Sequence, residues 1–158
     1  MLGFTTFLQA FVCDLTQPLS LLSNVPSSSV DVISVIFVLS AIDPLKHSIV
    51  VNNLAAVLSP GGRILFRDYG LYDQAQLRFK RGHKIQDNFY KRQDGTRCYY
   101  FEVDALRTLF EEAGFEAVEC RYVQRQTVNK KEDISVPRVF VQAQFVKKAG
   151  EKTADSSP

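Results

Sequence analysis

Residues 30–66 read VDVISVIFVLSAIDPLKHSIVVNNLAAVLSPGGRILF, and this stretch decides the fold. Its first part, Val32–Leu39, is an apolar run rich in β-branched residues, which is typical of a strand covered on both faces. Its last part, Arg63–Phe66, is a second apolar segment that follows a Ser-Pro-Gly-Gly turn. The pattern predicts two parallel strands joined by a helix, a βαβ unit that closes right-handed.

The helix between these strands is marked at its start and along one face. Asp43 can cap it, and Pro44 suits its first helical position. Apolar side chains then recur at helical spacing at Leu45, Ile49, Leu54, Val57 and Leu58.

Working outward, we expect further elements on both sides of this unit. Phe11 and Val12, before Cys13 and Asp14, predict a preceding buried strand. An amphipathic helix is predicted over residues 103–113, where Gly114 suits its left-handed end. Alternating segments at 117–124 and 136–145, joined by a Lys-rich stretch, predict an antiparallel strand pair at the sheet edge. The fold class is therefore α/β, a parallel sheet ending in an antiparallel strand pair.

Bulk properties exclude several classes of protein. The 158 residues have the size of one domain, and a net charge of +2 does not by itself indicate a nucleic-acid partner. Three scattered cysteines without C-x-x-C spacing indicate neither a disulfide framework nor a zinc site. The longest apolar stretch, Val32–Ile42, is too short to span a bilayer. We expect no metal, no membrane partner, and a cytoplasmic protein that can also be nuclear.

Open α/β sheets bind ligands just beyond the carboxyl ends of their strands. That rule selects Asp14, residues 37–41 and Arg67-Asp68-Tyr69 as candidate site residues. Fold alone assigns no chemistry to them. Asp14 can equally be a turn or cap residue, and Asp68 can equally form a salt bridge to Arg67 or Arg78.

Longer strings carry a family resemblance. FVCDLT, VDVISVIFVLSAI, FRDYGLYDQAQLRFK, NFYKRQDGTRCYYF and QTVNKKEDISVPRVF resemble the tRNA 3-methylcytidine methyltransferases, most of all the branch acting on serine tRNAs. The similarity runs from about Ala10 to about Lys147. It implies the C-terminal part of a class I, Rossmann-like, S-adenosylmethionine-dependent methyltransferase, with residues 1–146 forming a partial methyltransferase domain and residues 147–158 a disordered tail. The sequence contains no G-x-G, so we expect a truncated form that lacks the Gly-rich loop and binds cofactor weakly.

The resemblance also implies roles for individual residues. Asp14 accepts from the adenine amino group of the cofactor, the Leu15 amide reaches the ring, and Ile36 packs on it. Phe37 is a further cofactor-side residue, and with Tyr69 and Tyr72 it could stack on the target base. These aromatic residues could equally fill a core.

Asp68 is the implied catalytic carboxylate, with Tyr69 beside it. Cytosine N3 carries a free lone pair, so methyl transfer requires no strong general base. Positioning and electrostatics should dominate. A carboxylate that accepts from the cytosine amino group would supply base identity and charge stabilisation together.

Basic residues cluster between Arg78 and Arg97, where seven Lys or Arg residues are interleaved with aromatics. The charge run alone favours a solvated loop, whereas the resemblance favours a surface that binds folded RNA. The expected RNA-binding residues are Arg78, Lys80, Lys91, Arg92, Arg97, Lys130, Lys131 and Arg138.

Three functions remain open at this point. The first is a tRNA methyltransferase that forms 3-methylcytidine in the anticodon loop, with serine tRNA as substrate and seryl-tRNA synthetase as an implied partner. The second is a catalytically silent fragment that retains RNA or partner binding. The third is a small-molecule methyltransferase, against which the basic, aromatic insert argues.

Overall fold

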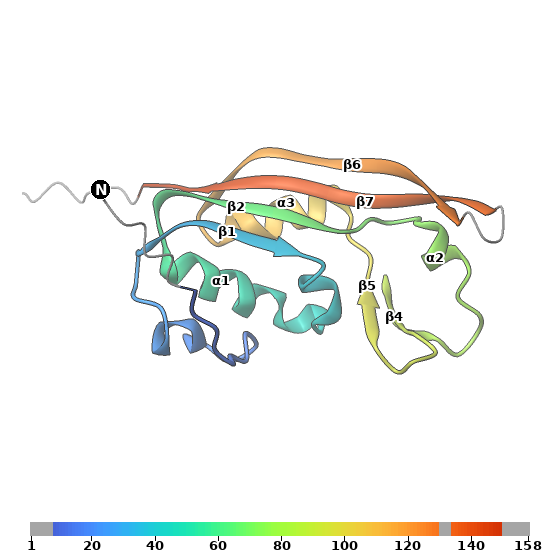
Figure 1. Cartoon of the computed structure of the whole chain (residues 1–158), viewed down its shortest axis with the longest axis horizontal. Helices are drawn as coiled ribbons and strands as arrows, with labels where there is room; N and C mark the ends of the chain where they lie inside the picture. Colours follow the sequence, from blue (N-terminus) through green and yellow to red (C-terminus); the bar gives the residue numbers. More distant parts are fainter. Residues whose placement is uncertain (1–7, 130–133, 150–158) are drawn as a thin grey trace, which may run out of the picture.

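The computed structural model describes residues 8–129 and 134–149, and it contains a large sheet, a small sheet and two main helices (Figure 1). The large sheet has four strands in the order β1-β2-β7-β6. Its strands are β1 (Val30–Ile36), β2 (Leu58–Tyr69), β6 (Phe115–Asn129) and β7 (Ile134–Lys147). The small sheet, β3-β4-β5, contains β3 (Lys84–Gln86), β4 (Phe89–Lys91) and β5 (Arg97–Tyr99).

The predicted βαβ unit is present. β1 and β2 pair in parallel, and helix α1 (His47–Val57) connects them. The chain enters α1 through two short 3-10 helices, η2 (Leu39–Ala41) and η3 (Pro44–Lys46). The Asp43 carboxylate accepts from the Leu45 amide at 3.0 Å, so the predicted cap is confirmed.

The antiparallel pair is also confirmed, with strands longer than the alternation indicated. β6 and β7 pair from Phe115 opposite Lys147 to Asn129 opposite Ile134. β7 lies between β2 and β6, so the last strand of the chain joins the pair to the parallel part of the sheet. Lys147 is part of β7, one residue beyond the expected domain boundary, and residues 150–158 of the expected tail lie outside the described residues.

Both main helices pack on the same face of the large sheet. The buried core joins α1, the helix α3 (Val103–Glu112) and the inner side chains of β2 and β7. The stacked rings of Phe110 and Phe145, 4.0 Å apart, lie at its centre. The helix predicted at 103–113 is confirmed, and Gly114 has the left-handed φ of 87° that ends it.

The expectation that β1 is covered on both faces is wrong. Val32 and Ile36 are 55% and 46% exposed, and Leu65 of β2 is 43% exposed beside them. The described helices cover only the inner face, so the outer face of the sheet presents apolar side chains to solvent. A β-branched run therefore marked the strand correctly but not its surroundings.

The strand expected at Phe11 and Val12 does not form either. Residues 8–14 have no regular structure, and both apolar side chains are exposed. A strand gains its hydrogen bonds only from a neighbouring strand. Among the residues that the structure describes, no strand pairs with this segment.

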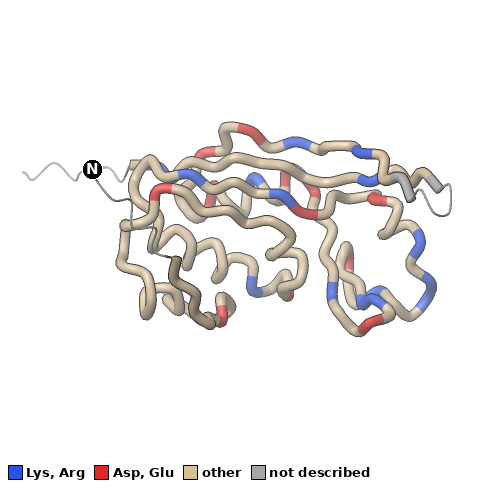
Figure 2. Tube along the Cα trace, viewed as in Figure 1, with Lys and Arg blue, Asp and Glu red and all other residues tan. Residues whose placement is uncertain are grey.

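The basic stretch after Arg78 is folded, which sequence reasoning did not anticipate. The short helix α2 (Gln74–Leu77) leads into β3, β4 and β5, which form a small lobe beside the large sheet (Figure 1). We call residues 74–99 the insert. Lys and Arg positions gather along this lobe (Figure 2). No helix in the described ranges is long and apolar enough to cross a membrane.

Candidate functional site

The carboxyl ends of β1 and β2 meet at a buried carboxylate. Asp68, near the end of β2, is fully buried, and one of its oxygens accepts from the Ser40 amide at 2.9 Å. The other oxygen accepts from the Tyr69 amide at 2.9 Å. Asp68 thereby fixes the loop that follows β1 to the end of β2. Burial raises the pKa of this carboxyl above its ordinary value, against the lowering effect of the Ser40 hydrogen bond.

This position bears on the expected role of Asp68. The alternative of a salt bridge to Arg67 or Arg78 is not formed within residues 8–129 and 134–149. Both oxygens are engaged by backbone amides, so Asp68 organises the site as it stands. Its contact with a substrate base stays a prediction.

Four aromatic rings gather around the end of β2, next to Asp68 in the chain. Phe37 lies 5.1 Å from Tyr69 and 5.7 Å from Phe140, measured between ring centroids, and Tyr69 lies 5.9 Å from Tyr100. We call Phe37, Tyr69, Tyr100 and Phe140 the aromatic cluster. Tyr69 and Phe140 are paired across β2 and β7, so the sheet register places them side by side. Tyr72, the other candidate for stacking, is exposed.

The backbone of Phe37 is held in an unfavourable conformation. Its φ is 54°, in the left-handed region that bulky residues rarely adopt, and its amide donates to the Arg67 carbonyl at 2.8 Å. The conformation turns the chain at the end of β1 and leaves the ring 42% exposed. Such strain at an exposed aromatic residue is typical of functional sites.

Three guanidinium groups lie over the aromatic cluster. Arg67 and Arg138 lie 4.8 and 5.3 Å from the Phe140 centroid, and Arg92 lies 5.2 Å from that of Tyr69. Cations over aromatic faces at these distances attract the rings. The cluster thus has a positive side, which suits a negatively charged substrate.

Arg138 is anchored by a buried carboxylate. Its Nε donates to both oxygens of Asp73 at 2.9 and 3.0 Å, and Asp73 has no exposed surface. Asp73 also accepts from the Val139 amide at 2.7 Å and from the Ala75 amide at the start of α2. The pair ties the start of the insert to β7. A direct contact of Arg138 with RNA stays a prediction.

The expected cofactor residues lie in two places. Asp14 is exposed, and its carboxylate accepts from the amide and hydroxyl of Thr16 at 2.9 and 2.8 Å, which lowers its pKa. Leu15 lines an apolar cavity of about 260 Å³ with Val38 and the buried side of α1. Ile36 lies on the outer face of the sheet, in a separate depression.

A partial fit to an adenine follows from this geometry. The Asp14 carboxylate is an exposed acceptor, and the Leu15 amide donates to no described residue. One acceptor and one donor side by side match an amino group and a ring nitrogen. The alternative that Asp14 is a turn residue is also correct, because its carboxylate accepts from Thr16 two residues later and so stabilises a turn. The cofactor contacts of Ile36 and Phe37 stay predictions.

The expected RNA-binding residues lie in different surroundings. Arg78, Lys80 and Arg92 line one open cavity of about 360 Å³, whereas Lys91 is exposed on β4. Arg97 lies 3.9 Å from Asp43, the cap of η3. Lys130 and Lys131 lie outside the described residues.

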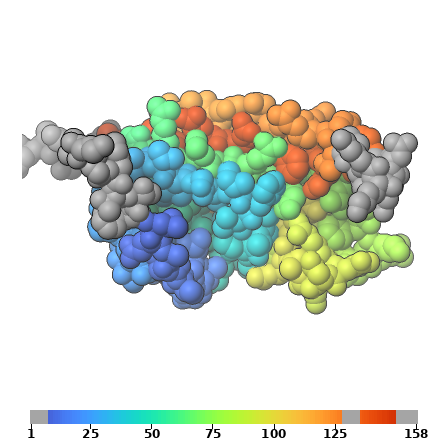
Figure 3. Space-filling model, viewed as in Figure 1, coloured from blue at the N-terminus to red at the C-terminus, as the bar shows by residue number. Residues whose placement is uncertain are grey.

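His47 is a site residue that sequence reasoning missed. Its Nε2 lies 3.0 Å from the Leu39 carbonyl and 3.2 Å from that of Ile42, so it donates to both ends of the loop that Asp68 holds. Its ring stacks on Phe101 and meets Tyr99 of β5 edge-on. Figure 3 shows the yellow β4–β5 segment against the cyan segment after β1. His47 therefore connects the insert to this loop, and an isolated histidine gave no signal of it.

In the described part of the chain, no three His, Cys, Asp or Glu side chains group as metal ligands. The geometry instead offers a buried carboxylate, an aromatic surface and guanidinium groups at the carboxyl edge of an α/β sheet.

A family model for the methyltransferase domain matches residues 7–120. The chain belongs to the methyltransferase-domain family.

Several individual proteins are similar to this chain in sequence. The chain is 55% identical over 139 residues to human tRNA N(3)-cytidine methyltransferase METTL6, covering 88% of this chain and 49% of that protein. It is 53% identical over 151 residues to the mouse protein of the same name, covering 94% and 53%. It is 47% identical over 142 residues to O-methyltransferase 3 of Dictyostelium discoideum, covering 89% and 32%. The chain spans about half the length of the METTL6 relatives.

Solved structures confirm the fold class. A SAM-dependent methyltransferase from Methanosarcina mazei superposes with a TM-score of 0.62 at 16% identity, covering 85% of this chain and 65% of that one. One from Anabaena variabilis gives 0.58 at 14% identity, covering 85% and 56%. The chain has the class I methyltransferase fold, and the α/β expectation of a parallel sheet ending in an antiparallel pair is confirmed.

Proposed function

We propose that this chain carries the substrate-facing half of a tRNA methyltransferase that forms 3-methylcytidine in an anticodon loop. The observation that carries the proposal is the aromatic cluster with its three guanidinium groups, which adjoins a buried carboxylate at the carboxyl ends of β1 and β2. An exposed, positively flanked aromatic surface suits an extruded base and its phosphates. The 55% identity to tRNA N(3)-cytidine methyltransferases supports the same chemistry.

The cofactor in this proposal is S-adenosylmethionine, which supplies an electrophilic methyl group when bound. Asp14 and Leu15 would hold its adenine end. Cytosine N3 attacks with its own lone pair, so the chain needs no group that removes a proton from that atom. Its residues instead orient the base and stabilise the positive charge that develops on it.

The aromatic cluster would orient the base. Phe37 and Tyr69 present faces on which a cytosine can stack, and their backbone is fixed by the Asp68 network. Asp68 precedes Tyr69 in the chain, and in its ionised form it would favour a base that becomes cationic. Each Asp68 oxygen accepts only one amide bond and can accept another, but Asp68 has no exposed surface, so direct acceptance from the cytosine amino group requires the Ser40 loop to move.

RNA binding is assigned to the insert and the β6–β7 ribbon. Arg78, Lys80, Lys91, Arg92 and Arg97 lie on or beside the small sheet. Lys130 and Lys131 lie between β6 and β7 in the sequence, and Arg138 lies in β7. We assign serine tRNA as the substrate and seryl-tRNA synthetase as a partner, because the sequence strings resemble the serine branch. We also propose a cytoplasmic protein that can enter the nucleus.

One experiment tests the function. The chain is incubated with labelled S-adenosylmethionine and unmodified serine tRNA, with and without seryl-tRNA synthetase, and the digested RNA is analysed for 3-methylcytidine. Product confirms the proposal. If this chain is silent, the same assay is run on a fusion with the preceding half of a METTL6 relative. Activity of the fusion would establish the second candidate, a silent fragment that retains binding, and failure of both would refute the proposal.

The relative named O-methyltransferase 3 supports a different product, methylated on oxygen. The nucleoside analysis separates the two chemistries, because 3-methylcytidine and ribose-methylated cytidine are distinct nucleosides. Activity on a small hydroxylated metabolite that does not respond to salt would favour the small-molecule enzyme, since RNA binding weakens steeply with salt.

A further inference from the structure

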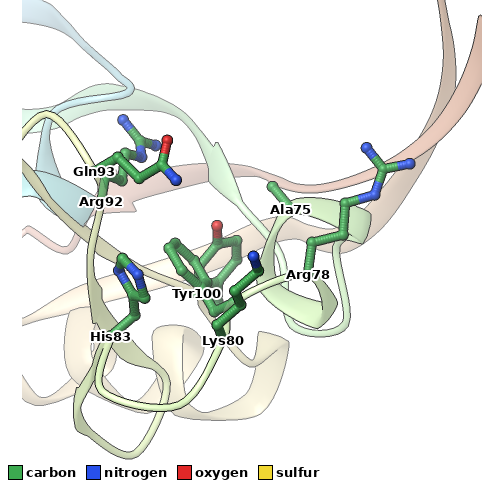
Figure 4. Close-up of a pocket in the computed structure, with 8 residues that line it drawn as sticks. Ala75, Arg78, Lys80, His83, Arg92, Gln93 and Tyr100 are labelled. Atoms are coloured by element: carbon green, nitrogen blue, oxygen red, sulfur yellow. The ribbon is translucent and has the colours of Figure 1, made fainter.

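The cavity between α2 and the small sheet has the character of an anion site. It is lined by Arg78, Lys80, His83, Arg92, Gln93 and Tyr100, together with apolar atoms of the insert, and it has a volume of about 360 Å³. Figure 4 shows Lys80 and His83 on two sides of Tyr100, with Arg78 extending outward at the rim. The lining contains three permanent cations and no carboxylate.

The acidic residues of the insert do not neutralise these cations. Asp87 pairs with Lys84, and Asp94 accepts from the amide and hydroxyl of Thr96. Neither Lys84 nor Thr96 lines the cavity. For Arg78, Lys80 and Arg92, no carboxylate oxygen of the described residues lies within salt-bridge distance. The cations of the cavity are therefore held in no salt bridge among the described residues, although the charge of Arg92 acts on the nearby Asp94 and Asp68 carboxyls and has a lowering effect on the pKa of each.

Among the three cations, Arg92 gives the clearest indication of an anion site. Its guanidinium is half-buried and fixed, because its Nη2 donates to the Cys98 sulfur at 3.2 Å and its amide donates to the Thr96 carbonyl at 2.7 Å. Sulfur is a weak acceptor, and the Tyr69 ring on its other side is a weak partner as well. The Arg92 guanidinium thus contacts two neutral side chains, Tyr69 and Cys98, and forms no salt bridge among the described residues, so an anionic acceptor such as a phosphate would bind it more strongly.

The cavity adjoins the aromatic cluster. Tyr100 belongs to both, since it lines the cavity and its ring lies 5.9 Å from that of Tyr69. Arg92 lines the cavity and also lies 5.2 Å from the Tyr69 ring centroid. A group bound in the cavity would therefore lie close to a base stacked on Tyr69.

We propose that this cavity binds the phosphodiester next to the reacting cytidine of the RNA, with Lys80 and Arg92 as its cationic partners. The inference rests on the proposed function and adds to it a defined subsite. Tyr100 has no exposed surface, and burial raises the pKa of its hydroxyl above the ordinary value, so Tyr100 contributes a neutral wall to the cavity. Arg92, which also lies beside the Tyr69 ring, would align the backbone while the base stacks on the aromatic cluster.

The test locates the phosphate by pairing protein and RNA changes. Stem-loop RNAs with a single loop cytidine carry one uncharged methylphosphonate at each loop position in turn, and their affinities are measured for the wild-type chain, Lys80→Gln and Arg92→Gln. Arg63→Gln is the control, because Arg63 is exposed and lies six residues before Tyr69 on β2, about 20 Å away. Removing one phosphate contact should also lower the salt slope of log K by about 0.7.

The expected result is coupling at the phosphates flanking the cytidine. There the methylphosphonate weakens wild-type and Arg63→Gln binding but costs Lys80→Gln and Arg92→Gln nothing further. Equal losses at every position, or coupling at a distant phosphate, would overturn the subsite while methylation of cytidine left the proposed function standing.

A second measurement does not depend on RNA. Inorganic phosphate is titrated against the labelled chain and followed by amide NMR. We expect shifts at Gly82, His83 and Gln93 that are lost in Lys80→Gln, and the absence of shifts there would refute the anion site. Phosphate binding in a chain that binds no RNA would refute the RNA occupant and leave a site for a free anion.

Discussion

Replacing Asp73 by alanine should be among the most damaging single changes to this chain. Asp73 is fully buried, accepts from Arg138 Nε with both oxygens, and accepts from the Val139 amide at 2.7 Å. It also accepts from the Ala75 amide at the start of α2. The substitution therefore removes an ion-pair partner, a helix cap and the acceptor of a strand amide at once.

The magnitude follows from these three losses. Removing one partner of a buried ion pair costs about 3–5 kcal/mol, and losing a helix cap costs about 1 kcal/mol. Arg138 retains 23% exposure of its side chain and its contacts with Phe140, so water recovers part of its solvation. The contributions share atoms and do not add. We expect a loss of about 3–4 kcal/mol in the free energy of unfolding, or about 10 °C in Tm for a chain of this size.

Urea and thermal unfolding followed by circular dichroism measure this loss. Asp87→Ala is the control, because Asp87 is 95% exposed in its ion pair with Lys84 and should leave the midpoint unchanged. Asp73→Leu combined with Arg138→Met removes both charges and should recover the part of the lost stability that comes from the unpaired Arg138, but not the part that comes from the Val139 and Ala75 amides. If Asp73→Ala unfolds like the wild type, or if the double variant is worse than either single one, the buried pair does not hold the insert to β7.

Three further changes test other parts of the molecule. Burial lowers the pKa of His47, so the unfolded chain takes up a proton near the ordinary value of 6.5 while the folded chain does not, and stability should fall as the pH drops below about 6.5. His47→Gln, which keeps a donor, should make the urea midpoint less sensitive to pH between pH 7 and 5. An unchanged pH profile would contradict this. Asp68→Ala should lower methyl transfer by at least about 100-fold while S-adenosylmethionine binding, measured by calorimetry, stays nearly intact; a variant with wild-type turnover would remove Asp68 from the site. The exposed apolar face of β1 predicts self-association, and Val32→Lys should shift sedimentation toward the monomer; a wild-type chain that already sediments as a monomer would refute that expectation.

The sequence predicted those parts of the fold that local patterns determine. The βαβ unit, the Asp43 cap, helix α3 and the β6–β7 pair each follow from spacing and punctuation within a few residues. The strand at Phe11 failed because two apolar residues do not specify a neighbour. The small sheet was missed because β3, β4 and β5 have only three residues each, too few to show alternation among charged residues.

The candidate site was predictable only where it lies on parallel strands. Phe37, Asp68 and Tyr69 follow from the rule that ligands bind at carboxyl ends. Phe140 and Asp73 could not be found that way. Phe140 joins the aromatic cluster through the register of β7 on β2, and Asp73 meets Arg138 across 65 positions of sequence. Register and long-range pairing depend on how the last strand enters the sheet, which no local pattern reports.

The insert and the loop after β1 act as one unit because two buried groups hold that loop from opposite sides. Asp68 holds the Ser40 amide from β2, while His47 holds the carbonyls of Leu39 and Ile42 and packs against Tyr99 of the insert. Any displacement of β5 must therefore disturb His47, and through it the loop that positions Phe37. RNA seated on the insert would reach the aromatic cluster by this path as well as through Arg92. If RNA binds the insert as proposed, these contacts would link the proposed phosphate subsite to the aromatic cluster.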